Sequence, residues 1–403
     1  MLDGDQGPAV QKAMQIVNAL ATIYEAEHLL PVASAQIAGV SYKNLGQPGL
    51  SFLEEWATQG ARVRVPAFMN PAGMDLERWQ EMGISESFAR QQQRVVEALV
   101  SMGVTQSCTC TPYLAGNVPQ AGEHLAWSES SAVSYANSVL GARSNREGGP
   151  SALAAAITGR TAAYGLHLDL SRKATHQVSV QCPVAGEADF GALGHWVGQQ
   201  VGDGVPYFRF ADSANLTHSP AQEQLMALGA AMAASGAVAL YHIEGVTPEA
   251  AQVVAEIDAL PRIEINDLSA SYEALNHPLD HIDFVSLGCP HSTLADLERV
   301  AVLLDGRRLR AALWITTSRY VRRVAEERGW VQRIEAAGGQ VFADTCLVVA
   351  PIEELGFRAL ATNSAKAAFY APSHSGLQRR FGTLEQCIEA ALTGRWDARG
   401  HNG

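Results

Sequence analysis

Short apolar runs alternate with helical patterns through the second half of the chain. Four runs rich in β-branched or other apolar residues have the length and composition of strands, and each has a helical segment before or after it. These predicted strands span residues 237–243, 282–287, 310–316 and 340–342. Gly turns join the segments, and alternating strands and helices are typical of βα units. The pattern therefore predicts a mostly parallel sheet.

Helical spacing of apolar residues predicts further elements. After Ser292, apolar residues recur every three or four positions until Asp305-Gly306 ends the pattern, and segment 320–337 behaves in the same way. The remaining predicted elements are helices at 8–28, 50–60 and 383–392 and strands at 29–33 and 63–66.

Residues 225–241 form a long, mostly apolar stretch without a charged residue. The stretch is shorter than the roughly 20 apolar residues that a membrane span needs, so we expect a buried Ala-rich helix there. We see no internal repeat and no low-complexity linker. Turn-forming residues suggest one sub-domain break, within 205–225.

Composition narrows the class of protein. Of the 403 residues, 47% are hydrophobic and 17% are charged, which fits a globular protein with a large core. The net charge of −12 argues against binding to nucleic acid or to an anionic membrane. Six cysteines are too few for a disulfide scaffold, and the N-terminus lacks the basic and apolar segments of a secretory signal. We therefore expect reduced thiols and a cytoplasmic protein.

The densest group of polar residues lies in 122–149, among small residues and glycines. Small residues let a ligand approach the backbone, and paired Arg and Glu side chains can bind and orient a carboxylate. An exposed helix with Ser caps and a surface ion pair explains the same pattern equally well. The functional candidates in this segment are Glu129, Ser130, Ser131, Asn137, Arg143, Asn145 and Arg146.

Cysteine positions carry more information. Cys289 and Cys346 each follow a predicted strand, where α/β proteins place ligands and where the next helix stabilises a thiolate. Cys108 and Cys110 lie together in SCTCTPY. The chain has no C-x-x-C, H-E-x-x-H, G-x-S-x-G, G-x-G-x-x-G or P-loop motif, which removes the common zinc, serine-hydrolase and nucleotide sites. The cysteines that we expect to be buried core residues are Cys182 and Cys387.

Lysine is rare in this chain, so a lysine within a polar motif stands out. Lys366 lies in TNSAK, beside the hydrogen-bonding residues Asn363 and Ser364. A solvated lysine on the surface of a helix is the simple alternative.

Several long segments resemble those of a known family. They are CTCTPYLAGNVPQAGEHLAWSESSAVSYANSVLGARSNREGGPSALAAAITGRTAAYG, HIEGVTPEA, LGCPHSTLADL, DTCLVVAPI and TNSAKAAFYAP. Together they resemble the large subunit, or catalytic large domain, of the aconitase X family over nearly the whole chain. The resemblance implies an α/β, aconitase-like fold of mostly parallel sheets with flanking helices. It also implies that the site of an iron–sulfur cluster lies at an interdomain cleft.

The resemblance also implies an iron–sulfur dehydratase, a hydro-lyase that removes water from a small hydroxy acid. The cluster ligands would be Cys110, Cys289 and Cys346, which leaves the role of Cys108 open. Three thiolates leave one iron site free for the leaving hydroxyl, and the chemistry further needs a base and groups that stabilise charge on the carboxylate. The candidates are Glu129, Ser130, Ser131 and Lys366 for catalysis and Asn137, Arg143, Asn145, Arg146, Asn363 and Ser364 for substrate binding.

Two features distinguish this chain within the family. Ser34-Ala35-Gln36 occurs where some fused members have Ser-Ala-His. The family's small swivelling domain, which carries a catalytic serine in aconitase relatives, is not found before Gly403. We therefore predict a separate small subunit and poor activity of this chain alone.

The resemblance implies two substrates. The preference for Arg over Lys suggests a GC-rich bacterial source and favours cis-3-hydroxy-L-proline. The region around Ser41-Tyr-Lys-Asn is similar to archaeal two-subunit enzymes and favours the alternative, mevalonate 5-phosphate. A non-catalytic cluster-bearing scaffold and a zinc hydrolase are hypotheses from other classes.

Overall fold

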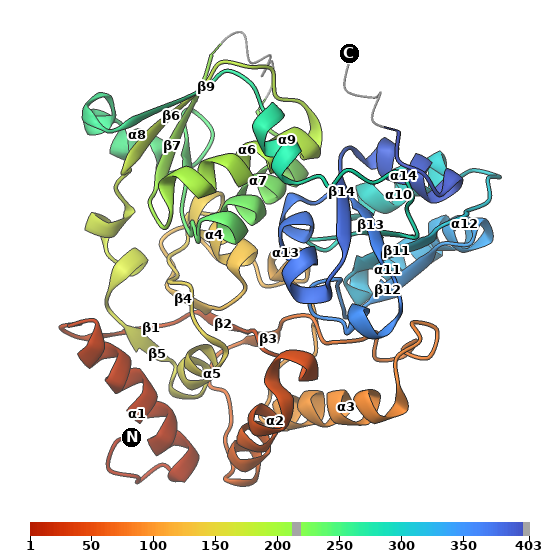
Figure 1. Cartoon of the computed structure of the whole chain (residues 1–403). Coiled ribbons are helices and arrows are strands. Elements are labelled where there is room, and N and C mark those ends of the chain that lie inside the picture. Colours follow the sequence, from red (N-terminus) through yellow and green to blue (C-terminus); the bar gives the residue numbers. More distant parts are fainter. Residues whose placement is uncertain (212–218, 398–403) are drawn as a thin grey trace.

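The computed structural model describes residues 1–211 and 219–397. Three sheets organise these residues into three lobes, each with its own helices (Figure 1). Every strand pair within these three sheets is parallel. A separate antiparallel pair joins β1 (Leu29–Pro31) to β5 (Arg160–Ala162). The predicted α/β class with mostly parallel sheets is confirmed.

The first lobe is built on a three-stranded sheet of order β3-β2-β4. Its strands are β2 (Ser34–Ile37), β3 (Ala67–Met69) and β4 (Leu125–Trp127). Its helices are α1 (Pro8–Ile23), α2 (Tyr42–Thr58), α3 (Glu86–Ser101) and α5 (Gly149–Thr158). Helix α5 packs on β2, α1 packs on α5, and α2 packs on α3. All of β2 is buried, as a central parallel strand covered on both faces must be.

The second lobe has a four-stranded sheet of order β8-β7-β6-β9. Its strands are β6 (His176–Val180), β7 (Pro206–Phe210), β8 (His242–Ile243) and β9 (Arg262–Ile265). Its helices are α4 (Ser130–Ser138), α6 (Gly186–Val201), α7 (Gln222–Ser235), α8 (Ala250–Val253) and α9 (Ser269–Ala274). The Ala-rich helix expected from the uncharged stretch is α7. It packs so closely on α6 that a Cβ on Gly236 would lie 1.9 Å from the Gly198 carbonyl oxygen.

The third lobe has a five-stranded sheet of order β12-β11-β10-β13-β14. Its strands are β10 (Phe284–Leu287), β11 (Ala312–Thr317), β12 (Gln340–Ala343), β13 (Ala359–Thr362) and β14 (Gln378–Phe381). Its helices are α10 (Leu294–Leu303), α11 (Arg319–Glu327), α12 (Trp330–Ala337), α13 (Ala365–Ser375) and α14 (Leu384–Thr393). Helix α13 also packs against α6 and α7, so it joins the third lobe to the second.

Several predicted boundaries differ from the structure for local reasons. Helix α1 ends at Ile23, before Glu25 adopts a φ of +52°. The single helix expected at 320–337 is two helices, because Gly329 takes the left-handed conformation between them. The strand predicted at 237–243 is reduced to β8, since Ala237 has a φ of +65° and the Tyr241 amide donates to the Ser138 hydroxyl.

Two predictions in the first lobe were wrong in position. The strand predicted at 63–66 is an extended loop whose amides bond to Met102 and Ala156, and β3 begins only after Pro66. The helix predicted at 50–60 begins earlier, at Tyr42, and is kinked at Gly46.

The sub-domain break predicted within 205–225 includes residues 212–218, which lie outside the described residues. On either side of them, Phe208 and Leu225 belong to one hydrophobic core.

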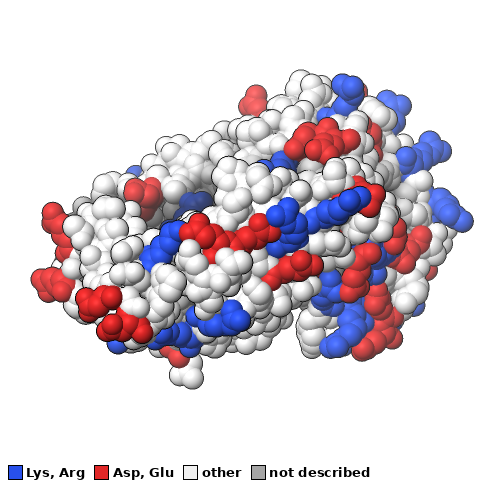
Figure 2. Space-filling model, turned by 90° about the horizontal axis from the view of Figure 1, so that it is seen from below, with Lys and Arg blue, Asp and Glu red and all other residues white. Residues whose placement is uncertain are grey.

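Among the described residues, no helix is both long and apolar enough to cross a bilayer. The face seen from below carries acidic and basic side chains next to one another (Figure 2). Exposed ion pairs join helices of the first lobe, which lie at the bottom of Figure 1: Lys12 with Glu55 at 2.9 Å, and Arg94 with Glu54 at 2.8 Å.

Candidate active site

The carboxyl ends of six parallel strands meet between the first and third lobes. In α/β proteins ligands bind at such edges, because the chain leaves each strand there and its next residues face a crevice. From the first lobe, Gln36 lies near the end of β2, Asn70 follows β3, and Ser128-Glu129 follows β4. From the third lobe, Cys289 follows β10, Cys346 follows β12, and Asn363-Ser364 follows β13.

Backbone contacts hold the two edges against each other. Ala72, just after β3, forms a parallel bridge with Thr345, just after β12. The Ala72 amide also donates to the carbonyl of Asp344 at 2.7 Å. The two lobes therefore share one site.

A buried ion pair lies at the centre of this site. The Lys366 ammonium donates to the Glu129 carboxylate and, more weakly, to the hydroxyls of Ser130 at 3.4 Å and Ser131 at 3.3 Å. The Lys366 and Glu129 side chains are only 9% and 13% exposed. The structure thus brings together the four predicted catalytic residues, and the simple alternative of a solvated Lys366 was wrong.

Each partner of the pair keeps the other charged. Burial alone would raise the pKa of Glu129, but the adjacent Lys366 ammonium together with hydrogen bonds from Asn70 and Ser131 outweighs burial and lowers this pKa to about 2. Burial alone would lower the pKa of Lys366, and Glu129 raises it above its ordinary value instead. Lys366 is therefore a buried cation whose charge is maintained by Glu129.

Asn70, which no sequence pattern singled out as a site residue, supports this pair. Its amide donates to the other Glu129 oxygen at 2.7 Å. Its signal in the sequence was a polar residue immediately after a short apolar run, but the predicted strand was placed three to four residues too early for that position to stand out.

Three buried polar atoms in the segments around the pair have no partner among the described residues. They are Gln36 Oε1, Asn70 Oδ1 and Thr345 Oγ1. Buried polar groups are nearly always hydrogen-bonded. These atoms therefore mark positions where a bound substrate or water would be held.

The thiols of Cys110, Cys289 and Cys346 are neighbours in space. Burial raises the pKa of Cys346 to about 12, and the next contribution comes from Cys289. Burial also raises the pKa of Cys110, with further contributions from Glu129, Cys346 and Cys289. The Cys110 thiol thus interacts electrostatically with both other cysteines, the Cys346 thiol interacts with Cys289, and both interact with the Glu129–Lys366 pair.

The remaining cysteines lie elsewhere. Cys108 is buried in the core of the first lobe, where Asp344 and Arg319 are the charges nearest to its thiol. Cys182 and Cys387 belong to the hydrophobic cores of the second and third lobes, as predicted.

These donors fit an iron–sulfur cluster. Within residues 1–211 and 219–397, no three or more His, Cys, Asp or Glu side chains converge as ligands of one metal ion would. A cluster makes a different demand, because its thiolates bind separate iron atoms around its outside. Three neighbouring thiols beside a lysine ammonium, two of them from buried residues and the third from the partly exposed Cys289, meet that demand, since metal binding deprotonates a coordinating thiol even where burial favours its neutral form.

Two of the predicted substrate-binding residues lie at this site. Asn363 and Ser364 line a pocket together with Cys289. The Ser364 hydroxyl caps α13 by accepting from the Ala367 amide at 3.1 Å, and it also interacts with the Cys289 thiol. The lining of the same pocket also includes Glu187, Glu223 and Asp296.

The other four predicted substrate-binding residues form hydrogen bonds or ion pairs with other parts of the protein. Asn137 uses its amide on the backbone of Ser144 and Ala239, seven residues and therefore about 10 Å along α4 from Ser130. Asn145 is committed to the backbone of Tyr164 and Leu166. Arg143 pairs with Asp169 at 2.5 Å, and the exposed Arg146 donates to Ala233 O at 3.2 Å. For Asn137 and Asn145 the structure thus shows a role in holding loops.

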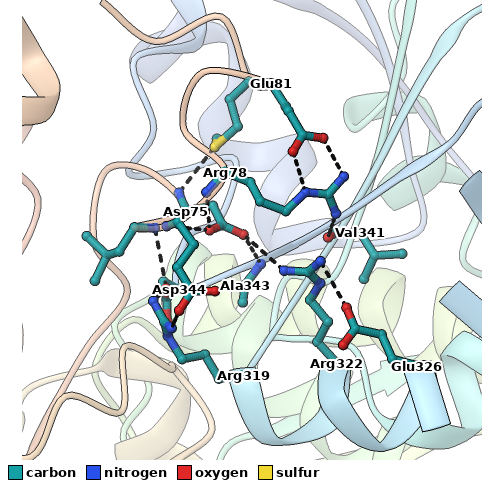
Figure 3. A network of polar contacts seen from close by, with 12 residues as sticks. Asp75, Arg78, Glu81, Arg319, Arg322, Glu326, Val341, Ala343 and Asp344 are labelled. Carbon is teal, nitrogen blue, oxygen red and sulfur yellow. Dashed lines mark hydrogen bonds and ion pairs between the residues drawn. The ribbon is translucent and has the colours of Figure 1, made fainter. Parts of the chain in front are cut away.

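An ion-pair network supports the segment that leads to Cys346 (Figure 3). Asp344 has a φ of +66° and is fully buried, and its carboxylate accepts from Arg319 Nε at 2.8 Å and Nη2 at 2.6 Å. Burial raises the pKa of Asp344 to about 6, against the lowering by Arg319. Asp75 accepts from the Ala343 amide at 2.8 Å and lies 3.8 Å from Arg322. The network ties the loop after β3 to the end of β12.

Comparisons with known proteins agree with this fold and site. The chain matches the Aconitase X first domain over residues 1–170, the second domain over 174–273 and the third domain over 282–393. The crystal structure of Thermococcus kodakaraensis aconitase X (holo-form) superposes with a TM-score of 0.89, with 45% identity and 97% of both chains covered.

Relatives with assigned activities are all dehydratases. The phosphomevalonate dehydratase large subunit of Methanothermobacter thermautotrophicus is 52% identical, covering 94% of this chain and 93% of that protein. The cis-3-hydroxy-L-proline dehydratase of Pseudomonas aeruginosa is 36% identical, covering 98% of this chain and 69% of that protein.

The fold, the site and these relatives define a dehydratase, that is, a hydro-lyase. More particularly, the chain belongs to the aconitase X family. The hypothesis of a non-catalytic scaffold finds no support among these relatives.

The network around Asp344 gives a stability prediction. Replacing Arg319 by Met leaves a buried carboxylate without its cation, so we expect the free energy of unfolding in urea to fall by about 3 kcal/mol, near the low end for a broken buried pair because Arg319 is partly exposed. The matched control is Arg323→Met on the same helix, whose guanidinium only stacks on Tyr320 and should change stability by less than about 0.5 kcal/mol. Equal losses for both variants would contradict this account.

Proposed function

We propose that this chain is the large subunit of an iron–sulfur dehydratase that acts on mevalonate 5-phosphate. The observation that carries the proposal is the buried Glu129–Lys366 pair beside three neighbouring thiols, where the strand ends of two lobes meet. Removing two charges from water can cost more free energy than their mutual attraction returns, so a buried ion pair is poor evidence of a role in stability. A role in binding and converting a charged substrate explains why the pair lies at this position.

The choice of substrate rests on the relatives. Four phosphomevalonate dehydratase large subunits are 45% to 52% identical to this chain, against 33% and 36% for the two hydroxyproline dehydratases, and the match to these large subunits spans nearly their whole length. These relatives favour mevalonate 5-phosphate over cis-3-hydroxy-L-proline, which the Arg-over-Lys preference had favoured. Such a preference reflects base composition of the source and carries no information about the site.

The residues of this chain have separable tasks. Dehydration breaks a C–H bond next to the substrate carboxylate and the C–O bond of the neighbouring hydroxyl, and it forms a C=C bond and water. A cluster held by Cys110, Cys289 and Cys346 would supply a Lewis-acidic iron for the leaving hydroxyl. The Lys366 ammonium stabilises the negative charge that builds on the carboxylate as the proton leaves.

Glu129 and the two serines prepare Lys366 for this task. Glu129 fixes the ammonium, and Asn70 fixes Glu129. The contacts to the Ser130 and Ser131 hydroxyls are long, so a substrate carboxylate can replace one of them without breaking the ion pair.

A separate small subunit completes the proposal. Neither Glu129 nor Lys366 is free to accept the substrate proton, because each is held by the other. The acceptor would therefore come from the partner, as the catalytic serine of the small domain that the family resemblance implies. The relatives' designation as large subunits supports such a partner. Six unpaired thiols among the described residues support a cytoplasmic location.

The substrate is tested with the two-subunit complex. Purified under anaerobic conditions, the complex should convert mevalonate 5-phosphate to the unsaturated acid, followed by NMR, and leave cis-3-hydroxy-L-proline unchanged. The large subunit alone should be poorly active. Turnover of hydroxyproline alone would reverse the choice of substrate, and turnover of neither compound would reject both.

The predicted ligands are tested by iron content. Replacing Cys110, Cys289 or Cys346 by Ala should remove the brown colour and most of the iron from anaerobically purified protein, because an open cluster already has few protein ligands. Cys387→Ala and Cys182→Ala are the controls, since both thiols lie in hydrophobic cores. A wild-type protein that is folded and free of iron after reconstitution would defeat the cluster assignment.

The role of Lys366 is tested by kinetics. Lys366→Met in the iron-loaded complex should lower kcat about 10²- to 10³-fold, the usual effect of removing one preorganised charge-stabilising group. Because this change leaves Glu129 buried and unpaired, the double variant Lys366→Met/Glu129→Gln should recover stability but not kcat. Lys12→Met, at an exposed pair, is the control. Wild-type kcat in an iron-loaded Lys366→Met complex would refute the role.

A further inference from the structure

One buried side chain touches the segments of all three predicted cluster ligands. His291 follows Cys289 by two residues, and its backbone amide donates to Cys110 Sγ at 3.2 Å. Its ring Nδ1 lies 3.0 Å from Thr109 Oγ1, next to Cys110 in the chain. Its ring Nε2 lies 2.9 Å from the carbonyl oxygen of Thr345, next to Cys346. His291 therefore connects its own loop to two others, whose contacting residues are 182 and 54 positions away in sequence.

The directions of these hydrogen bonds follow from their partners. A carbonyl oxygen can only accept, so Nε2 carries the hydrogen that it donates to Thr345. In the neutral ring Nδ1 then has a lone pair and accepts from the Thr109 hydroxyl. Thr109 Oγ1 in turn accepts from the Thr111 amide at 3.2 Å. The network has one consistent direction, and it fixes the tautomer of His291.

The backbone amide and both ring nitrogens of His291 are already hydrogen-bonded, so none of them is available for other chemistry. The residue is 1% exposed, and its amide and both ring nitrogens are committed. It is thus neither an acid–base group facing the substrate nor a free ligand. What its contacts can do is to fix the separations of the three cysteine loops.

We propose that His291 is a positioning residue that sets the relative geometry of Cys110, Cys289 and Cys346 and thereby the assembly and retention of the cluster. The inference rests on the cluster of the proposed function. Residues that orient metal ligands without binding the metal commonly contribute 10- to 100-fold to metal affinity. An imidazole suits this place because it is rigid and has a donor and an acceptor at opposite sides of one ring.

The experiment measures cluster retention, not activity. Wild-type and His291→Leu chains are reconstituted anaerobically, and iron and sulfide content, visible absorption and the rate of iron loss to a chelator are recorded. We expect His291→Leu to lose iron about 10- to 100-fold faster, with altered absorption. His291→Gln, whose amide offers one donor and one acceptor, should recover part of the retention.

His195 provides a matched control. It is also a buried histidine, and its Nδ1 lies 2.9 Å from the Ser271 hydroxyl on α9 of the second lobe. His195→Leu should destabilise the apoprotein to thermal unfolding but leave the rate of iron loss unchanged. Equal iron loss in both variants would show that general destabilisation is the cause and would overturn the proposal.

A second site keeps the test decisive if His291→Leu does not fold. Thr109→Val keeps the shape of the side chain and removes only the hydroxyl that donates to Nδ1, so it should speed iron loss, whereas Thr109→Ser should not. Wild-type retention in Thr109→Val would overturn the proposal. An iron-loaded wild-type chain with an unchanged His291→Leu would overturn the positioning role alone, and a wild-type chain that never binds iron would overturn both this role and the proposed cofactor.

Discussion

The buried ion pair between Glu129 and Lys366 is the constraint on which the arrangement of the site depends. The two residues are 237 positions apart and come from different lobes, one after β4 and the other from α13. A buried charge that loses its partner is strongly unfavourable, because neither water nor a counterion replaces it. Shifting one lobe along the other would leave each charge buried without its partner, so the pair fixes which positions of the two sheet edges face each other.

This juxtaposition explains why the chemistry gathers in one place. Each parallel strand ends at the same edge of its sheet, so polar residues after successive strands collect there without any special sequence motif. Two such edges face each other here. The edge of the first lobe supplies Glu129 and the amide of Asn70. The edge of the third lobe supplies Cys289, Cys346, Lys366 and Ser364, which caps α13. The third thiol, Cys110, comes from a loop of the first lobe and is met by the amide of His291.

An ion-pair network outside the site supports the segment that leads to Cys346. The aspartates at 75 and 344 turn the chain before Cys346, and arginines on α11 neutralise them (Figure 3). Such a network holds a loop more rigidly than backbone contacts alone, since charge-assisted hydrogen bonds are stronger and directional. The ring of His291 also supports this segment, through a hydrogen bond between uncharged groups. The loop that carries Cys346 is thus held both by this network and by His291.

The sequence by itself determined the local features of this protein. Periodicity of apolar residues predicted β10 to β12 and the helices α10, α11, α12 and α14 of the third lobe, because buried faces repeat every two or about 3.6 residues, but it did not predict β13, α13 or β14. Placement after strands singled out Cys289 and Cys346, and the scarcity of lysine singled out Lys366. The family resemblance brought Cys110 into the same group. Element ends were missed where one residue took a positive φ, as at Ala237 and Gly329.

Only the tertiary structure decided which polar residues belong together. The segment 122–149 offered Glu129, Asn137 and Asn145 as equals, yet two helical turns separate Asn137 from Glu129, and loop closure commits both asparagines to backbone groups. Asn70 and His291 drew no attention because each acquires its role from contacts made far along the chain. A linear sequence states which groups are available, whereas pairing of buried polar atoms depends on distances that exist only after the lobes have packed.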